Sequence, residues 1–161
     1  MYKKIQEATS YIQSVTKIKP KVGLILGSGL GVYVDQIEDQ VIIPYTDIPH
    51  FHQTTVEGHQ GRLIIGKVKG VDVAVLQGRY HVYEGHSLED VVLPTRVLCL
   101  LGAENMILTN AAGGINSDYI PGDLVYITDH INMTGRNPLV GPNITELGPR
   151  FPDMTQAYDL E

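Results

Sequence analysis

The first part of the chain carries a helical pattern of apolar residues, and short apolar runs follow it. Residues 3–18 place apolar side chains at the spacing of one helix face, at Ile5, Ala8, Ile12 and Val15. The later runs are typical of strands and lie at 22–26, 41–45, 62–68, 71–76, 106–108 and 124–128. Lys69-Gly70, between two of these runs, predicts a hairpin turn.

A second long helix is predicted from Ser87 to about Leu101. Ser87 and Asp90 fit a capping box at its start, and Gly102 ends the helical pattern. Pro94 lies inside this helix, where we expect it to sit in the first turns or to kink the chain. Residues 153–161 have the pattern of the start of a further helix. Strands that alternate with helices predict an α/β fold, with a mixed and largely buried sheet flanked by helices.

Composition narrows the class of protein. The 161 residues suit a single domain, and 43% hydrophobic with 19% charged residues is typical of a globular chain. Twelve Lys and Arg residues against eighteen Asp and Glu give a net charge of −6, which argues against a nucleic-acid-binding surface. A single cysteine, Cys99, excludes a framework of intrachain disulfides and favours a cytoplasmic setting. Neither a secretory signal nor a membrane-spanning run is predicted.

Three glycine-containing polar loops follow predicted strands, at Gly27–Gly31, Gly78–Gly85 and Asn110–Gly114. Ligands of open α/β sheets bind beyond the carboxyl ends of the strands, so these loops form the candidate site. The first loop, Gly-Ser-Gly-Leu-Gly, suits an anion, because backbone amides and a serine hydroxyl can cradle a phosphate. A tight turn without a ligand is the alternative. A dinucleotide-binding fingerprint is excluded, because Val32 stands where that pattern needs its third glycine.

The second loop holds the densest group of polar side chains. Arg79 and His81 alternate in the sequence, so in an extended chain they point to the same side and can clamp an oxyanion. Tyr83 continues that side, and its phenol can reach a sugar hydroxyl while the ring covers the sugar. Glu84 can orient His81. A surface hairpin whose charges satisfy one another is the alternative.

The remaining polar residues give weaker indications. His59 lies in a glycine-flanked polar loop, where a solvated side chain and a functional one are both open. His50 and His52 have His-x-His spacing, but Asp47 is the only nearby carboxylate in the sequence, so no metal site is predicted. The third loop offers backbone donors and a floor of small residues for a flat ligand. No pair of carboxylates stands out, which argues against a glycosidase of the two-carboxylate kind.

A set of motifs in a fixed order gives the sequence a family resemblance. They are Leu-Gly-Ser-Gly-Leu-Gly (26–31), Glu-Gly-His-Gln-Gly-Arg-Leu (57–63), Gln-Gly-Arg-Tyr-His-Val-Tyr-Glu-Gly (77–85), Thr-Asn-Ala-Ala-Gly-Gly (109–114), Pro-Gly-Asp (121–123), Asp-His-Ile-Asn (129–132), Asn-Pro-Leu-Val-Gly-Pro-Asn (137–143) and Arg-Phe-Pro-Asp-Met (150–154). Together they resemble the trimeric purine nucleoside phosphorylases. The resemblance implies that residues 1–161 form a single domain of the nucleoside phosphorylase-like α/β/α fold, truncated at its C-terminus.

The resemblance also implies roles for individual residues. The residues implied to bind phosphate, through a backbone amide in the case of the last, are Ser28, His59, Arg79, Tyr80, His81 and Ala111. His81 and Glu84 are implied to be the catalytic pair, with Glu84 supporting the imidazole of His81. The residues implied to bind the nucleoside are Tyr83 at the ribose, Ala112 and Gly113 at the floor of the base pocket, and Phe151. Phe151 resembles an aromatic residue that reaches into the neighbouring subunit's site, which implies a homotrimer.

The implied activity is the reversible phosphorolysis of purine (deoxy)ribonucleosides in purine salvage. Its products are the free base and (deoxy)ribose 1-phosphate. The glycosidic bond breaks ahead of attack, and a phosphate dianion beneath the ring stabilises the positive charge on the ribose. Inorganic phosphate is then a co-substrate, and no cofactor, metal, nucleic acid or membrane is an expected partner.

The sequence departs from this family in length. The family chain is considerably longer, and the segments that supply its base-reading glutamate and asparagine have no counterpart before Glu161. We therefore expect these 161 residues to be inactive by themselves. The alternatives are a non-catalytic phosphate- or nucleoside-binding fragment, and a methylthioadenosine phosphorylase, whose phosphate-binding segment looks different from residues 77–85. A nucleotide-binding oxidoreductase is disfavoured by the failed glycine fingerprint.

Overall fold

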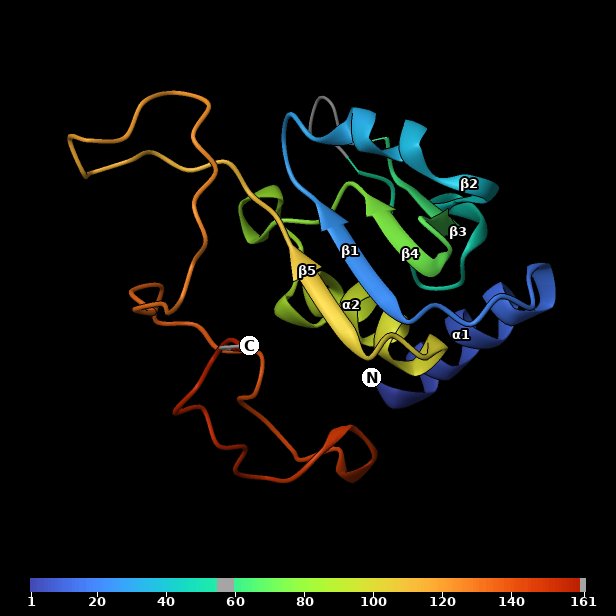
Figure 1. The fold of residues 1–161 in the computed structure, drawn as a ribbon. Helices are drawn as coiled ribbons and strands as arrows, with labels where there is room; N and C mark the ends of the chain where they lie inside the picture. The colour runs from blue at the N-terminus through green and yellow to red at the C-terminus, as the bar shows by residue number, and fades with distance from the viewer. Residues whose placement is uncertain (55–59, 160–161) are drawn as a thin grey trace. The chain divides into compact units, whose positions relative to one another are not determined.

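The computed structural model of the chain describes residues 1–54 and 60–159. The chain forms two units, Met1–Ala111 and Ala112–Glu161. The first unit holds the strands and the α-helices that the described residues form (Figure 1). In the described part of the second unit, the only regular element is a short 3-10 helix, η4 (Thr145–Leu147).

The first unit is built on a five-stranded mixed sheet with the order β2-β3-β4-β1-β5. The strands are β1 (Val22–Leu26), β2 (Glu38–Pro44), β3 (Arg62–Val68), β4 (Val71–Gln77) and β5 (Asn105–Leu108). β1 pairs in parallel with β4 and with β5, whereas β3 is antiparallel to β2 and to β4. The carboxyl ends of β1, β4 and β5 therefore lie at the same edge of the sheet (Figure 1).

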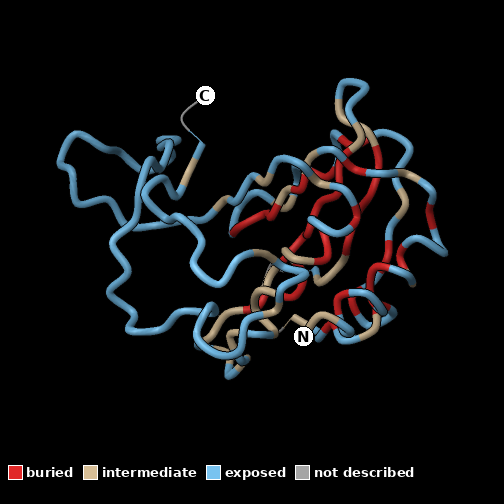
Figure 2. Tube along the Cα trace, turned by 90° about the horizontal axis from the view of Figure 1, so that it is seen from below, coloured by how far each residue is buried: buried red, intermediate tan, exposed pale blue. Residues whose placement is uncertain are grey.

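Two α-helices, α1 (Tyr2–Val15) and α2 (Leu88–Leu101), pack against one face of the sheet. Their apolar side chains and those of the strands form the main core, which includes Ile5, Ala8, Ile12, Ile25, Leu63, Ile65, Ala74, Leu76, Leu93, Val97 and Leu98. Successive side chains of a strand alternate between the two faces, so Val73 and Val75 join a smaller core on the opposite face. There the 3-10 helix η1 (Gly31–Gln36) contributes Val34. Figure 2 shows the buried segments of both cores in red.

The main elements follow the sequence patterns. The predicted mixed α/β sheet with flanking helices is confirmed. The hydroxyl of Ser87 caps α2 by accepting a hydrogen bond from the amide of Asp90 at 3.2 Å. The helix continues through Pro94 and ends at Gly102, whose φ of +120° suits only glycine well. The hairpin turn between β3 and β4 has positive φ at both Lys69 and Gly70, 48° and 79°, as its sequence indicated.

Other local predictions were wrong. Residues 124–128 form no strand, because a strand needs a neighbouring backbone to pair with, and none of the described strands pairs with this stretch. No helix forms over residues 153–159, and residues 160–161 lie outside the described part. The strand expected from residue 41 begins at Glu38, and Tyr45 opens the short helix η2 (Tyr45–Asp47) instead of ending the strand.

No helix among the described residues is long and apolar enough to cross a membrane.

Candidate functional site

The loop Gly27–Gly31 leaves β1 at the edge where β4 and β5 also end. A side chain at position 27 has no room, because a Cβ atom there would lie 2.6 Å from the carbonyl oxygen of Thr109 and 2.8 Å from the Cα of Asn110. Gly29 has a φ of +85°, which favours glycine, and Ser28 is exposed. The loop is a tight turn in which the amide of Leu30 donates to the carbonyl of Gly27 at 3.3 Å.

Arg79 and His81 lie next to each other beyond the end of β4. Gly78, with a φ of +113°, redirects the chain after the strand. The guanidinium of Arg79 donates from Nε to Nε2 of His81 at 3.3 Å and from a terminal nitrogen to the carbonyl of Thr109 at 2.5 Å. The bond to Thr109 brings the arginine to the chain end of β5. A guanidinium and an imidazole side by side are a suitable pair for holding an oxyanion.

Glu84 fixes the orientation of the His81 ring. The carboxylate side chain is only 5% exposed, so it needs hydrogen-bond partners. It accepts a bond from the backbone amide of His81 at 2.8 Å and contacts Nδ1 of the same residue at 2.6 Å. These bonds cap the short helix η3 (Val82–Glu84). The partners suit an imidazole that donates from Nδ1 to Glu84 and accepts at Nε2 from Arg79.

Tyr83 covers the outer side of the imidazole. Its ring stacks on that of His81, with the centroids 4.6 Å apart and the planes at 19°. Tyr83 itself is 76% exposed. The helix η3 turns the chain between the two residues, so they meet by stacking rather than by the extended alternation that the sequence suggested. An exposed aromatic ring beside a histidine is available to cover a sugar.

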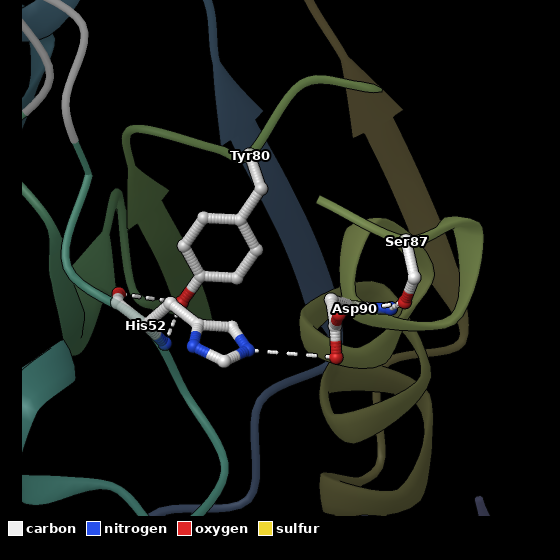
Figure 3. Close-up of polar contacts among 4 residues, drawn as sticks. All are labelled: His52, Tyr80, Ser87 and Asp90. Carbon is white, nitrogen blue, oxygen red and sulfur yellow. Dashed lines mark hydrogen bonds and ion pairs between the residues drawn. The ribbon is translucent and has the colours of Figure 1, made fainter. Parts of the chain in front are cut away.

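Tyr80 faces the core, in contrast to its neighbours Arg79 and His81. Its side chain is 2% exposed and makes edge-on ring contacts with Tyr45 and Phe51. Its hydroxyl accepts from the amide of His52 and donates to the carbonyl of the same residue, both at 2.9 Å (Figure 3). Burial raises the pKa of Tyr80, so the phenol stays neutral and can keep donating.

His50 and His52, the pair with metal-ligand spacing, bind different carboxylates. Nε2 of His50 lies 2.5 Å from Glu7 on α1, whereas Nε2 of His52 lies 3.4 Å from Asp90 on α2 (Figure 3). Burial acts to raise the pKa of Asp90, but hydrogen bonds from Ser87 and His52 outweigh it and leave the pKa below its usual value. Among the described residues, no three His, Cys, Asp or Glu side chains are grouped to hold a metal ion.

The remaining predicted site residues are not part of this arrangement in the described structure. Ala111 is exposed and ends the first unit. Ala112, Gly113 and Phe151 belong to the second unit, where all three are exposed. His59 lies outside the described residues. The structure thus brings together Arg79, His81, Tyr83 and Glu84, and Thr109 links Arg79 to the Gly27–Gly31 loop.

Sequence reasoning missed Thr109 and Gln77. The hydroxyl of Thr109 accepts from the amide of Gly27 at 2.8 Å, and the amide of Gln77 donates to the carbonyl of Gly31 at 2.7 Å. A signal was present in the sequence, because each is a polar residue at the end of an apolar strand run. Their partners lie 82 and 46 positions away, and spacing alone does not reveal such distant contacts.

Comparison with known proteins now adds to the geometry. A family model described as the phosphorylase superfamily matches residues 21–161. The chain therefore belongs to the phosphorylase superfamily. The match begins at the residue before β1 and includes all three polar loops.

Particular relatives narrow this class. The chain is 53% identical over 161 residues to purine nucleoside phosphorylase 1 of Bacillus subtilis, and the matched region covers 100% of this chain and 59% of that protein. The protein of the same name from Geobacillus stearothermophilus is 53% identical over 154 residues, covering 96% of this chain and 56% of its own length. The crystal structure of isoform 2 of purine nucleoside phosphorylase from Schistosoma mansoni, in complex with cytosine and ribose-1-phosphate, has a TM-score of 0.91 at 48% identity and covers 99% of this chain and 57% of that one. The chain thus spans a little over half the length of the relatives it matches.

Proposed function

We propose that this chain is part of a purine nucleoside phosphorylase, which cleaves purine (deoxy)ribonucleosides with inorganic phosphate in purine salvage. The observation that carries the proposal is the arrangement of Arg79, His81 and Glu84 beside the Gly27–Gly31 loop, at the carboxyl edge of the sheet. A guanidinium, an imidazole oriented by a buried carboxylate and a glycine-rich turn are the parts that a phosphate dianion needs. The names and identities of the relatives support the same activity.

The chemistry follows from where the charges stand. As the glycosidic bond breaks, its electron pair leaves with the purine base and the ribose carbon becomes positively charged. Phosphate held beneath the sugar stabilises that charge and is already aimed at the carbon, to which one of its oxygens then bonds. The products are the free base and (deoxy)ribose 1-phosphate. Phosphate is the nucleophile in this scheme, so we expect no cofactor and no metal.

Residue roles follow the same scheme. Phosphate is held by Arg79 and by His81 in the form that donates from both ring nitrogens, with Nε2 turned to the anion in place of Arg79. The exposed hydroxyl of Ser28, the amide of Ala111, His59 and the segment that includes Tyr80 complete the set. The buried phenol of Tyr80 is committed to His52, so we assign its contribution to the backbone between Arg79 and His81. Glu84 acts through His81 by fixing its ring.

The nucleoside side of the site is assigned to a different set. Tyr83, stacked on His81, is placed to cover the ribose. Ala112 and Gly113 form the floor of the base pocket. Phe151 is contributed from a neighbouring subunit of a homotrimer, in a protein located in the cytoplasm. We further propose that both units belong to one nucleoside phosphorylase-like domain.

The test is an assay of the protein expressed from its whole reading frame. Inosine and guanosine should be cleaved only when phosphate is added, with ribose 1-phosphate formed in equal amount to the base. Cleavage that is independent of phosphate, or no cleavage of any purine nucleoside, would refute the proposal. Preference for 5′-methylthioadenosine over both would favour a methylthioadenosine phosphorylase instead.

A matched pair of variants tests the role of the buried carboxylate. Glu84→Ala removes both bonds to His81, so we expect kcat/KM to fall by roughly 100-fold, the scale of a lost proton-handling or orienting group. Glu89→Ala removes an exposed carboxylate five positions further on and should leave turnover unchanged. Equal activity in the two variants would remove Glu84 from the mechanism.

A further inference from the structure

We propose that Thr109 and Gln77 are positioning residues that hold the two ends of the Gly27–Gly31 loop in the shape that receives phosphate. The inference rests on the proposed function, because it assigns a phosphate to that loop. Neither residue is expected to touch the substrate. Each reaches the loop from the end of a neighbouring strand, Thr109 from the residue after β5 and Gln77 from the last residue of β4.

Thr109 holds the first end of the loop through its hydroxyl. Oγ1 accepts from the amide of Gly27 at 2.8 Å and donates to the carbonyl of Ile25 at 3.0 Å. The hydroxyl is thus used as both acceptor and donor, which fixes its rotation. The backbone of Thr109 lies so close that only glycine fits at position 27. Bond and close packing together pin the start of the loop to β5.

Thr109 also sets the place of the arginine. Its carbonyl oxygen accepts from the Arg79 guanidinium at 2.5 Å. One residue therefore contacts the start of the glycine loop through its side chain and the main cationic group through its backbone. The separation between loop and guanidinium depends on it, and this separation must match the size of a phosphate. A misplacement of about 1 Å between a bound reactant and its partner is enough to lower the reaction rate strongly.

Gln77 holds the other end of the loop. Its side chain is 4% exposed, and its amide nitrogen donates to the carbonyl of Gly31 at 2.7 Å. Its amide oxygen accepts from Nε of Arg62 at 2.5 Å, and Arg62 is also its partner in the β3–β4 register. A donor at one end and an acceptor at the other leave the amide with one orientation. Arg62 thus fixes the side-chain amide of Gln77, and this amide in turn holds the carbonyl of Gly31 in place.

The consequence is a loop that is shaped before phosphate arrives. The amide of Gly27 is occupied by Thr109, and that of Leu30 by the carbonyl of Gly27. The amides of Ser28 and Gly29 and the Ser28 hydroxyl remain between the two held ends. A loop that is already ordered loses less entropy when it binds an anion, so its affinity for phosphate is higher. Loosening either end of the loop should therefore weaken the binding of phosphate more than the binding of nucleoside.

The first experiment compares threonine variants of the protein expressed from its whole reading frame. Thr109→Val keeps the shape and removes the hydroxyl, so KM for phosphate should rise roughly tenfold, as expected for about 1.4 kcal/mol. KM for inosine should change less than threefold, and Thr109→Ser, which keeps the hydroxyl, should restore the phosphate KM. Thr16→Val is the matched control, because it removes a bond of the same kind, from the amide of Ile18 to a threonine hydroxyl, after α1.

The second experiment measures the loop itself. Amide hydrogen exchange of Leu30, whose amide donates to the carbonyl of Gly27 within the loop, should be roughly tenfold faster in Thr109→Val and in Gln77→Met than in the wild type. Gln40→Met is the matched control for the glutamine, because the Gln40 amide donates to carbonyls at the far end of η1. It should leave exchange of the Leu30 amide unchanged.

The two readouts separate the inference from the function on which it rests. Unchanged exchange of the Leu30 amide in both variants, or equal rises of the phosphate and inosine KM values, would overturn the positioning role. Faster exchange in a protein whose wild type lacks phosphate-dependent turnover would refute the proposed function while upholding the two contacts as supports of the loop. A phosphate KM that Thr109→Ser fails to restore would also count against the hydroxyl.

Discussion

The two units of the chain differ in how far their apolar side chains are buried. In Met1–Ala111 the helices and the sheet enclose buried residues such as Leu63, which is 0% exposed. In residues 112–159 no described residue is buried (Figure 2), and the side chain of Leu124 is 93% exposed. Both leucines lie in runs whose apolar pattern is typical of strands. Leu63 lies in a strand that pairs with two neighbouring strands and packs against the helices, whereas no described strand pairs with the run that holds Leu124. An apolar pattern therefore stabilises a unit only where neighbouring elements cover it.

This contrast extends to the candidate site. Arg79, His81 and Glu84 are fixed by bonds to one another and to elements of a packed unit. Phe151, in the second unit, is 88% exposed, and the Arg150 guanidinium lies 6.0 Å from its ring centroid. The groups that we assign to phosphate are thus prearranged by the fold of the first unit. Ala112, Gly113 and Phe151, which are assigned to the nucleoside, are not held by a core within their own unit.

The largest expected effect is on the core of the first unit. Leu63→Ala removes a fully buried side chain and should lower the free energy of unfolding by about 2–5 kcal/mol. Leu124→Ala, the same substitution in the second unit, should change it by less than about 0.5 kcal/mol. Urea denaturation followed by circular dichroism measures both. Similar losses in the two variants would mean that the second unit has a core of its own.

A smaller effect is expected from adding a methyl group. Gly27→Ala places a Cβ atom 2.6 Å from a backbone oxygen, so the structure must shift, and we expect a loss of about 1–3 kcal/mol. Gly113→Ala meets no atom within 4 Å and should be neutral for stability. Thermal unfolding of the two variants provides the measurement. A neutral Gly27→Ala would show that the β1 loop is not packed against residues 109–110.

Removing one hydroxyl gives a smaller change still. The phenol of Tyr45 donates to the carbonyl of Gly78 at 2.7 Å inside the core, so Tyr45→Phe should cost about 1–2 kcal/mol by leaving that carbonyl unpaired. In the second unit, Tyr126 is 76% exposed and donates to the carbonyl of Asp159 at 3.3 Å. Tyr126→Phe should be without effect, because water replaces the lost partner. Equal melting temperatures for both variants would contradict this account.

The smallest expected effect concerns acid stability. Burial acts to raise the pKa of Asp90 in the folded chain, but hydrogen bonds from Ser87 and His52 outweigh it and hold the pKa below its ordinary value. A carboxyl with a lowered folded pKa stabilises the protein above the unfolded value, and this stabilisation is lost as pH falls through the folded pKa. Asp90→Asn should therefore flatten the fall in stability below about pH 4.

Asp153 is the counterpart of Asp90 in the second unit. Hydrogen bonds from Thr155 lower its pKa as well, but it lies in a stretch without a core. Asp153→Asn should leave the acid unfolding curve of the first unit unchanged. Unfolding curves recorded at several pH values between about 3 and 7 compare the two variants. An identical acid profile for wild type and Asp90→Asn would show that this carboxylate does not stabilise the fold.

Local patterns predicted much of the first unit. The spacing of apolar residues located α1, and the apolar runs located β1, β3 and β4, because burial enforces these patterns residue by residue. Alternation also predicted that Arg79 and His81 share a side. The same alternation turns Tyr80 to the other side, which explains why its ring faces the core.

Tertiary contacts explain what the sequence did not reveal. The run at 124–128 is as apolar as a strand, but a strand exists only with a pairing partner. Thr109 acts on Gly27 across 82 positions, and Gln77 acts on Gly31 across 46, so neither contact leaves a periodic signal. Their polar side chains at strand ends were visible, but what they bind depends on the strand order β4-β1-β5.

The central claim is that the packed first unit carries the phosphate-binding groups. The most direct measurement is calorimetric titration of inorganic phosphate into the protein expressed from its whole reading frame, compared with Arg79→Gln and Arg136→Gln. Arg79→Gln removes a charged donor from the site and should raise the dissociation constant of phosphate at least tenfold, which corresponds to about 1.4 kcal/mol. Arg136→Gln removes an exposed arginine from the second unit and should leave the dissociation constant unchanged. Equal affinities in all three proteins, or a loss confined to Arg136→Gln, would contradict the claim.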